Sequence, residues 1–153
     1  MSRPGPSDPG TFIVEDGILP PMKFPSQEWA TEFMAAINAN EAYRAAASAW
    51  EGDILFLVRV ADPNAAAPGV HLALSHGQCS AATFHADARA ISSEFIYEGT
   101  SENWEKLLKG GIDPVKAILD GTFKIRGNLA KAMRFTKAAK ELVETASKVP
   151  TTP

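Results

Sequence analysis

The sequence predicts an α/β (α+β) fold in which a mostly antiparallel mixed sheet carries helices on one face. Three observations support this expectation. An apolar stripe at helical spacing runs through residues 26–50, strand-like segments separated by turn residues fill 54–97, and cap residues mark short helices in the last third. Strands joined by short turns favour antiparallel pairing, and the helices then cover one face of the sheet.

The first helix is expected to run from Ser26, a favourable N-cap residue, to about Trp50. Its apolar side chains recur at steps of three and four residues, which is typical of one buried helix face. These side chains are Trp29, Phe33, Ile37, Tyr43, Ala47 and Trp50. Gly52 and Asp53 then end the helical pattern.

Four strands are expected next. Residues 54–60 are apolar on both faces, as in a strand covered on both sides. Residues 70–75 alternate apolar and polar side chains, which indicates a half-buried strand. Segments 79–86 and 91–97 complete the set.

The last third contains clear start and stop signals. Ser101 is expected to cap a short helix that ends at Gly110 and Gly111. Asp113 followed by Pro114 predicts the next helix, because proline is favoured at the first helical position. A short strand over 122–126 and a final helix from Leu129 to about Ala146 complete the chain.

The bulk composition predicts one soluble, cytoplasmic domain. The 153 residues fit a single domain at 26–149, with a flexible lead-in at 1–25 and a flexible tail at 150–153. A single cysteine excludes an internal disulfide scaffold. The first ten residues contain no apolar run of the kind a signal peptide needs, and the densest apolar run, 54–58, is far shorter than the ~20 residues of a membrane span.

Charge is distributed unevenly along the chain. The net charge of −3 argues against nucleic acid as a partner. Residues 1–100 carry 5 Lys and Arg against 12 Asp and Glu, whereas residues 101–153 carry 10 against 6. The basic C-terminal third would suit transient contact with anionic lipid headgroups or with the phosphates of coenzyme A, and a solvated helix face is the alternative.

Residues 104–133 resemble the C-terminal half of a sterol carrier protein domain. The shared features come in the same order as in that family: a short helix with Trp104, the turn residues Gly111 to Pro114, and an apolar helix ending at Gly121. A strand of the form Lys-apolar-basic-Gly (124–127) and a helix with Met133 follow. Upstream, residues 26–97 match only by the order of a helix and then strands.

The resemblance implies helices and a mixed sheet that enclose an apolar tunnel for a sterol, a fatty acid or a fatty acyl-coenzyme A. It implies no covalent chemistry, and we expect no cofactor. The ligand-binding residues it implies lie on the inner faces of the matched elements: Trp104, Leu108, Ile118, Phe123, Ile125, Leu129 and Met133. Each would equally suit plain core packing. Lys124, Arg126 and Lys131 are candidates for contact with a charged headgroup.

Two other classes of function stay open at this level. A protein–protein interaction module, such as a homodimer, would use the same apolar faces around a closed core. A small serine hydrolase would use Ser75, within a sequence that approximates a nucleophile elbow, together with His85. That chemistry needs a strand, a turn and a helix, whereas a strand is expected after Ser75.

The histidines and the cysteine do not predict a metal site. His71, His76, Cys79 and His85 match no zinc-ligand spacing. If 70–75 is a strand, His71 points away from its apolar face. Cys79 has no flanking cation that would activate a thiol, and is expected to be a small buried hydrophobe.

Overall fold

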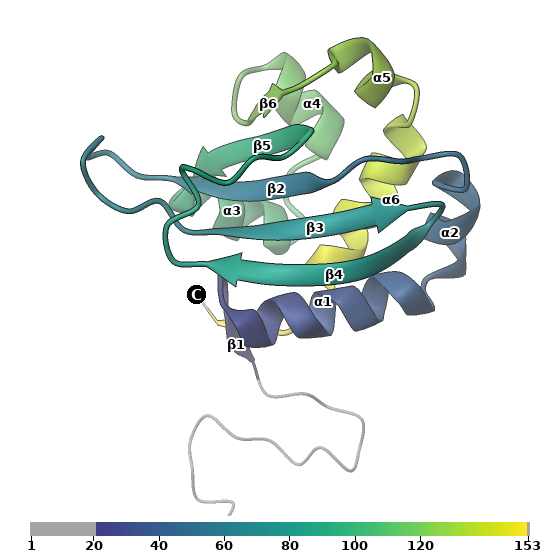
Figure 1. Cartoon of the computed structure of the whole chain (residues 1–153), viewed down its shortest axis with the longest axis horizontal. Coiled ribbons are helices and arrows are strands. Elements are labelled where there is room, and N and C mark those ends of the chain that lie inside the picture. The colour runs from purple at the N-terminus through teal and green to yellow at the C-terminus, as the bar shows by residue number, and fades with distance from the viewer. Residues whose placement is uncertain (1–20, 153) are drawn as a thin grey trace, which may run out of the picture.

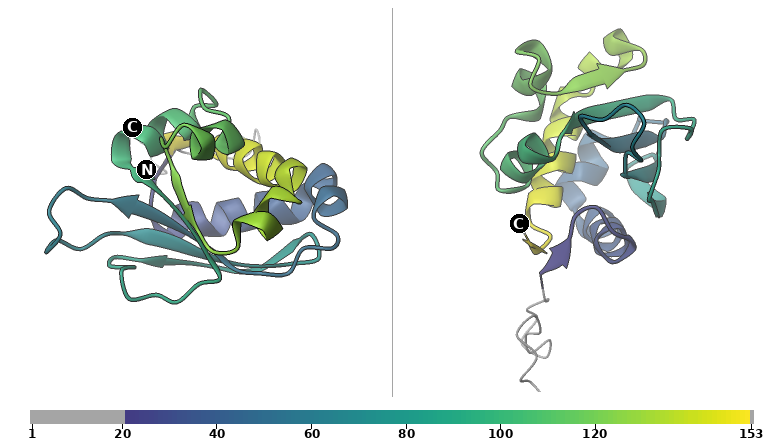
Figure 2. Two further views of the ribbon diagram at one scale, coloured as in Figure 1. Left: turned by 90° about the horizontal axis from the view of Figure 1, so that it is seen from above. Right: turned by 90° about the vertical axis from the view of Figure 1, so that its left-hand side faces the viewer.

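The computed structural model describes residues 21–152, which form a five-stranded sheet with a layer of helices on one of its faces (Figures 1 and 2). The strands are β2 (Ile54–Arg59), β3 (Gly69–Ser75), β4 (Gln78–His85), β5 (Phe95–Thr100) and β6 (Lys124–Arg126). Their order is β4-β3-β2-β5-β6, and only β2 and β5 run parallel. The predicted α+β class with a mostly antiparallel mixed sheet is therefore confirmed.

Six helices make up the second layer. They are α1 (Gln27–Ala39), α2 (Glu41–Ala46), α3 (Ser101–Leu108), α4 (Pro114–Leu119), α5 (Leu129–Met133) and α6 (Thr136–Ser147). The last of these contacts α1, α2, α3 and α4, so it lies at the centre of the helical layer. Seen from above, the helices lie on the same side of the sheet (Figure 2, left).

Both long helices expected from the sequence are interrupted. The first breaks at Asn40, which ends α1 and caps α2 by accepting a hydrogen bond from the Tyr43 N–H. The Asn40 side chain also donates to Thr145 Oγ1 on α6, at 2.7 Å. The prediction of one continuous helix is wrong here because a tertiary hydrogen bond, invisible in the local periodicity, fixes the break. The final helix similarly divides after Met133 into α5 and α6.

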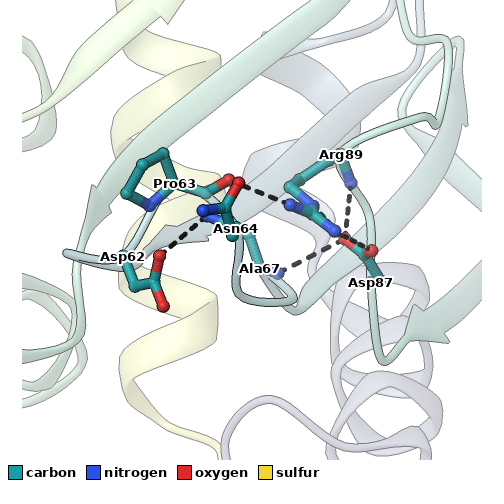
Figure 3. Close-up of polar contacts among 6 residues, drawn as sticks. All are labelled: Asp62, Pro63, Asn64, Ala67, Asp87 and Arg89. Carbon is teal, nitrogen blue, oxygen red and sulfur yellow. Dashed lines mark hydrogen bonds and ion pairs between the residues drawn. The ribbon is translucent and has the colours of Figure 1, made fainter.

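The connection between β4 and β5 passes over the outer face of the sheet. Ala88 in this connection is buried, and a side chain on Gly69 would collide with it and with the Phe56 carbonyl. Figure 3 shows how the connection is tied to the β2–β3 loop: Arg89 forms a two-point ion pair with Asp87 and donates to the Pro63 carbonyl at 3.1 Å. The following strand begins at Phe95, later than the predicted position 91.

The two ends of the described segment meet. Short strands β1 (Met22–Lys23) and β7 (Thr151–Thr152) pair in parallel, and Trp29 Nε1 donates to Thr151 Oγ1 at 2.9 Å. The sequence placed both strands in loose segments outside a domain at 26–149, because two residues are too short to give a strand pattern. Residues 1–20 and 153 lie outside the described part of the chain.

A dense group of aromatic side chains fills one half of the space between sheet and helices. We call it the aromatic cluster, and it consists of Phe24, Trp29, Phe33, Phe56, Tyr97, Trp104 and Phe123. Trp104 lies within 5.8 Å of four other aromatic rings, centroid to centroid, and donates from Nε1 to the Leu57 carbonyl at 2.9 Å. Such close packing leaves no room for a ligand between these rings.

Candidate ligand-binding site

Beyond the aromatic cluster, the space between the sheet and helices α4, α5 and α6 is incompletely filled. Two adjoining hollows of about 70 Å³ each lie there, and we call them together the apolar channel. They share a wall made of Ile54, Ile125, Ala132, Ala139 and Leu142. Because the two hollows share these residues, they lie next to each other in one apolar part of the interior.

Each hollow adds its own side chains to this shared wall. The first extends towards Trp50, Phe95 and Phe135, between α2 and the start of α6. The second extends towards Ile118 on α4 and Met133 on α5. Small residues explain why space remains, since alanines stand at 132 and 139 where leucine or phenylalanine would fill the gap.

The channel presents almost no polarity. Its lining contains no Asp, Glu, Lys, Arg or His. Burial raises the pKa of Tyr43 and of Tyr97 far above the usual range, so both phenols are neutral at physiological pH. The Tyr97 hydroxyl donates to the Pro114 carbonyl at 2.9 Å, and Trp50 Nε1 donates to the Gly52 carbonyl at 2.9 Å. With both of these groups hydrogen-bonded to the protein and no charged side chain in the lining, the channel suits an apolar guest.

One end of the channel reaches the surface between α4 and α5. Met133 lines the second hollow and is also 37% exposed, so the hollow opens beside it. The adjacent helix α5 has no buried residue of its own. A helix without buried side chains can move at low cost in apolar surface.

A single lysine holds α5 over the first hollow. Lys131 Nζ donates to the Glu51 carbonyl at 2.6 Å and to Glu94 Oε2 at 2.7 Å. The same ammonium lies 5.0 Å from the centre of the Trp50 ring, within range of a cation–π interaction. Lys131 is therefore committed to protein contacts in this closed arrangement.

The seven residues that the resemblance implied for ligand binding do not lie around one cavity in the structure. Ile118, Ile125 and Met133 meet around the channel. Phe123 is buried in the aromatic cluster, stacked on Tyr97 at 4.7 Å, and lines neither hollow. Leu129 is 49% exposed and also lines neither hollow.

Trp104 and Leu108, the remaining two, line a different hollow of about 370 Å³ between α3, the end of α6 and β7. It is the more spacious of the two regions, but Glu105, Lys109 and Lys148 contribute to its lining. A charged, wide lining suits an apolar chain poorly. We therefore place the candidate site in the apolar channel, despite its smaller volume.

Several channel residues were missed at the sequence level. Trp50 and Ile54 stood out as part of a helix stripe and a strand, with nothing to link them to a cavity. Ala132 and Ala139 carry a usable signal, since small residues on an otherwise apolar helix face leave space. Which alanine faces a gap depends on its packing partner, so that signal alone does not locate the site.

The three basic residues expected to meet a headgroup have different surroundings. Arg126 Nη2 lies 3.1 Å from the buried carboxylate of Glu98, and Lys131 is held by Glu94. Lys124 is exposed on β6 and forms no ion pair among residues 21–152.

The hydrolase hypothesis is wrong. Ser75 is followed by a tight turn and then by strand β4, so no nucleophile elbow exists. In the register of this hairpin Ser75 pairs with Gln78, whereas His85 pairs with Gly69 at the other end. At about 3.3 Å per strand residue, the two side chains are far too distant for proton transfer.

Two other potentially reactive residues, His71 and Cys79, are held in contacts within the fold. His71 Nε2 lies 2.6 Å from Asp53 Oδ2 on the outer face of the sheet, away from the apolar side chains of β3, as predicted. Cys79 is buried, which raises the pKa of its thiol to about 11 and confirms it as an inert small hydrophobe. Among residues 21–152 no group of three or more metal-ligating side chains comes together.

Comparison with known proteins identifies the fold and the family. The SCP-2 sterol transfer family matches residues 32–140. The chain belongs to this family. The match extends well upstream of residues 104–133, so the weaker resemblance of the N-terminal half is also genuine. Comparison with curated protein sequences gives no match.

Solved structures agree with this assignment. A crystal structure of sterol carrier protein 2 is 33% identical, with a TM-score of 0.74 over 80% of this chain and 95% of that one. The solution structure of a conserved hypothetical protein of Thermus thermophilus, described as possibly a sterol carrier protein, is 32% identical, with a TM-score of 0.76 over 86% and 93%. Members of this family are typically lipid or sterol carriers. Within residues 21–152 no helix is long and apolar enough to span a membrane.

Proposed function

We propose that this protein is a cytoplasmic carrier that binds an apolar lipid chain in the apolar channel, without covalent chemistry. The observation that carries the proposal is a lining without acidic or basic side chains that opens to the surface beside Met133. Each buried methylene contributes about 0.8 kcal/mol, so a long chain binds well without any polar contact.

The closed hollows must expand to admit such a ligand. Sites for small organic ligands usually occupy roughly 300–1,000 Å³, whereas the two hollows measure about 70 Å³ each. Displacement of α5 is the least costly way to gain this volume, because α5 buries no residue. We therefore expect the free protein to be closed and the ligand to hold α5 away from Trp50.

The shape of the channel favours a flexible acyl chain over a rigid sterol. Two narrow adjoining hollows admit a chain that bends from one to the other, while fused rings need one wider cavity. Exposed cations on α4 and β6, two elements that line the second hollow, would suit the carboxylate or phosphate group of a fatty acid or an acyl-coenzyme A; they include Lys116 and Lys124.

Replacing two native alanines of α5, one at a time, by phenylalanine tests this proposal. Ala132 lines both hollows, whereas Ala130, two positions earlier, is exposed and lines neither. Ala132→Phe should fill the channel and weaken binding at least about tenfold, with Ala130→Phe as the matched control. Native mass spectrometry and titration calorimetry with palmitate, palmitoyl-coenzyme A and cholesterol would measure this.

The expected result is a one-to-one complex with an acyl ligand that Ala132→Phe loses and Ala130→Phe keeps. If cholesterol bound more tightly than the acyl ligands, the proposed ligand would change from an acyl chain to a sterol, but the proposed site would stay the same. Binding unaffected by Ala132→Phe would move the site elsewhere. Absence of binding for all three ligands would end the proposal.

A further inference from the structure

The three large hydrophobic side chains that the described residues leave exposed lie close together in the sequence. Leu119 is 74% exposed, Leu129 49% and Met133 37%, and they fall on α4 and α5. In Figure 1 these helices and β6 between them form one end of the molecule. Single exposed leucines are ordinary on protein surfaces, but a group confined to one end indicates an interaction surface.

The same segment carries a strong positive charge. Residues 114–140 contain seven Lys and Arg against one acidic residue, Asp120, although the whole chain is net negative. Three of these cations are paired: Arg126 with Glu98, Lys131 with Glu94, and Lys140 with Asp113. The other four are exposed and form no ion pair among residues 21–152; they are Lys116, Lys124, Arg134 and Lys137.

We propose that this surface, formed by α4, β6, α5 and the start of α6, docks onto an anionic lipid bilayer. Exposed apolar side chains and unpaired cations carried by the same segment are the combination that binds at the headgroup region of such a membrane. The exposed leucines would enter the boundary between headgroups and acyl chains, and the four unpaired cations would meet lipid phosphates and carboxylates.

The charge pattern argues against a second copy of the chain as the occupant of this surface. A two-fold dimer through this face would bring eight unpaired cations from the two copies close together. An anionic membrane would instead attract the four unpaired cations of a single copy. The docking surface does not depend on the proposed carrier function, since Leu119, Leu129 and the four unpaired cations lie outside the channel lining.

Docking would place the opening of the channel at the lipid. Met133 belongs to both the exposed group and the channel lining, so the opening and the docking surface coincide. Leu119 and Leu129 belong only to the docking surface. This separation allows the two proposals to be tested independently.

Vesicle co-sedimentation is the direct test. We expect the full chain to bind vesicles of phosphatidylcholine with phosphatidylserine, to bind pure phosphatidylcholine vesicles weakly, and to lose binding at high salt. Leu119→Asp combined with Leu129→Asp should lower the bound fraction at least about fivefold. Because neither leucine lines the channel, palmitate binding in solution should stay unchanged in this variant.

A charge variant with a matched control completes the test. Lys124→Glu combined with Lys137→Glu should also abolish binding, whereas Lys109→Glu combined with Lys148→Glu should retain most of it. The control changes the net charge equally, but its two lysines line the hollow at the other end of α6. Equal loss in both variants, or equal binding to neutral and anionic vesicles, would overturn the proposal.

A concentration-dependent dimer that Leu119→Asp with Leu129→Asp dissociates, without vesicle binding, would also overturn it in favour of self-association. Vesicle binding without palmitate binding would leave the docking surface intact and remove the carrier function. Palmitate binding without vesicle binding would overturn the docking surface and leave the carrier function intact.

Discussion

The two halves of the interior use the same sheet and the same layer of helices, but they are packed in opposite ways. In the aromatic cluster, Trp104 contacts rings contributed by several elements, and these rings pack closely against one another. In the apolar channel, alanines on α5 and α6 face the sheet and leave two hollows. The candidate site therefore lies where the apolar side chains are too small to fill the interior.

Tyr97 and Phe123 form the boundary between the two halves. Their rings stack at 4.7 Å with an interplanar angle of 9°, and Tyr97 also lines the second hollow. The packed half thus supplies a rigid wall to the loose half. We expect substitutions in the cluster to change stability most and substitutions around the channel to change ligand binding most.

The largest effect should come from Trp104→Ala. Removing a fully buried indole with four aromatic neighbours should lower the free energy of unfolding by about 3–5 kcal/mol. Ile118→Ala, at a half-buried position of the channel, should cost less than about 2 kcal/mol. Urea unfolding of both variants measures the contrast, and similar losses would show that the halves are packed alike.

The next effect should come from Gly99→Ala in β5. A methyl group on Gly99 would collide with the Phe123 ring and displace it from Tyr97. Overpacking of this kind should cost about 1–3 kcal/mol in thermal or urea unfolding. Gly111→Ala is the control, because its methyl group would meet nothing closer than the Lys106 carbonyl at 3.5 Å. Equal tolerance of the two changes would mean that the Tyr97 wall is not rigid.

Lys131→Met should have a smaller effect on stability, but a clear effect on the rates of ligand association and release. The variant loses the contacts with Glu94 and with the Glu51 carbonyl that hold α5 over the channel. Stability should fall by less than about 1 kcal/mol, since the pair is near the surface. Stopped-flow measurement with a fluorescent fatty acid should show association and release at least about threefold faster. Lys137→Met, without such contacts, should keep the original rates; unchanged rates in Lys131→Met would show that α5 does not gate the channel.

The smallest effect is expected outside both halves, at Asp53. Desolvation would raise the pKa of its carboxyl, but hydrogen bonds from the Glu94 N–H and from His71 outweigh it and hold the pKa below the ordinary 3.8. The ionised Asp53 carboxylate therefore stabilises the fold above pH ~4. This contribution to the free energy of unfolding is lost as the pH falls below that value and the carboxylate is protonated.

Asp53→Asn should therefore be less stable than the parent protein at neutral pH, and the difference should shrink on acidification towards pH ~2. Acid titration of the unfolding free energy measures this, with palmitate binding at neutral pH as the control readout. A constant difference at every pH would mean that the Asp53 charge contributes nothing. Altered binding would mean that the outer face of the sheet is coupled to the channel.

Local signals predicted more of the fold than of the site. Asp113 followed by Pro114 begins α4 as expected, and the alternation in residues 70–75 forms β3. The breaks at Asn40 and after Met133 were not predicted, because at Asn40 a contact with Thr145 on α6 overrides an unbroken apolar periodicity. Of the seven implied site residues, the three that meet at the channel are on α4, β6 and α5. Leu129, which was assigned to the same inner face of α5, is instead 49% exposed.

The sequence by itself determined most of the secondary structure elements, their order, most of the inner faces of the sheet and helices, and the family. These depend on short-range periodicity, cap residues and ordered turn motifs. Only the tertiary structure decided which inner faces pack shut and which leave a channel. Trp104 and Ile118 have equivalent positions in a hydrophobic pattern, yet Trp104 packs among four aromatic rings and Ile118 faces the apolar channel. The difference depends on the volumes of residues distant in the chain that meet across the interior, and a one-dimensional pattern does not contain those pairings.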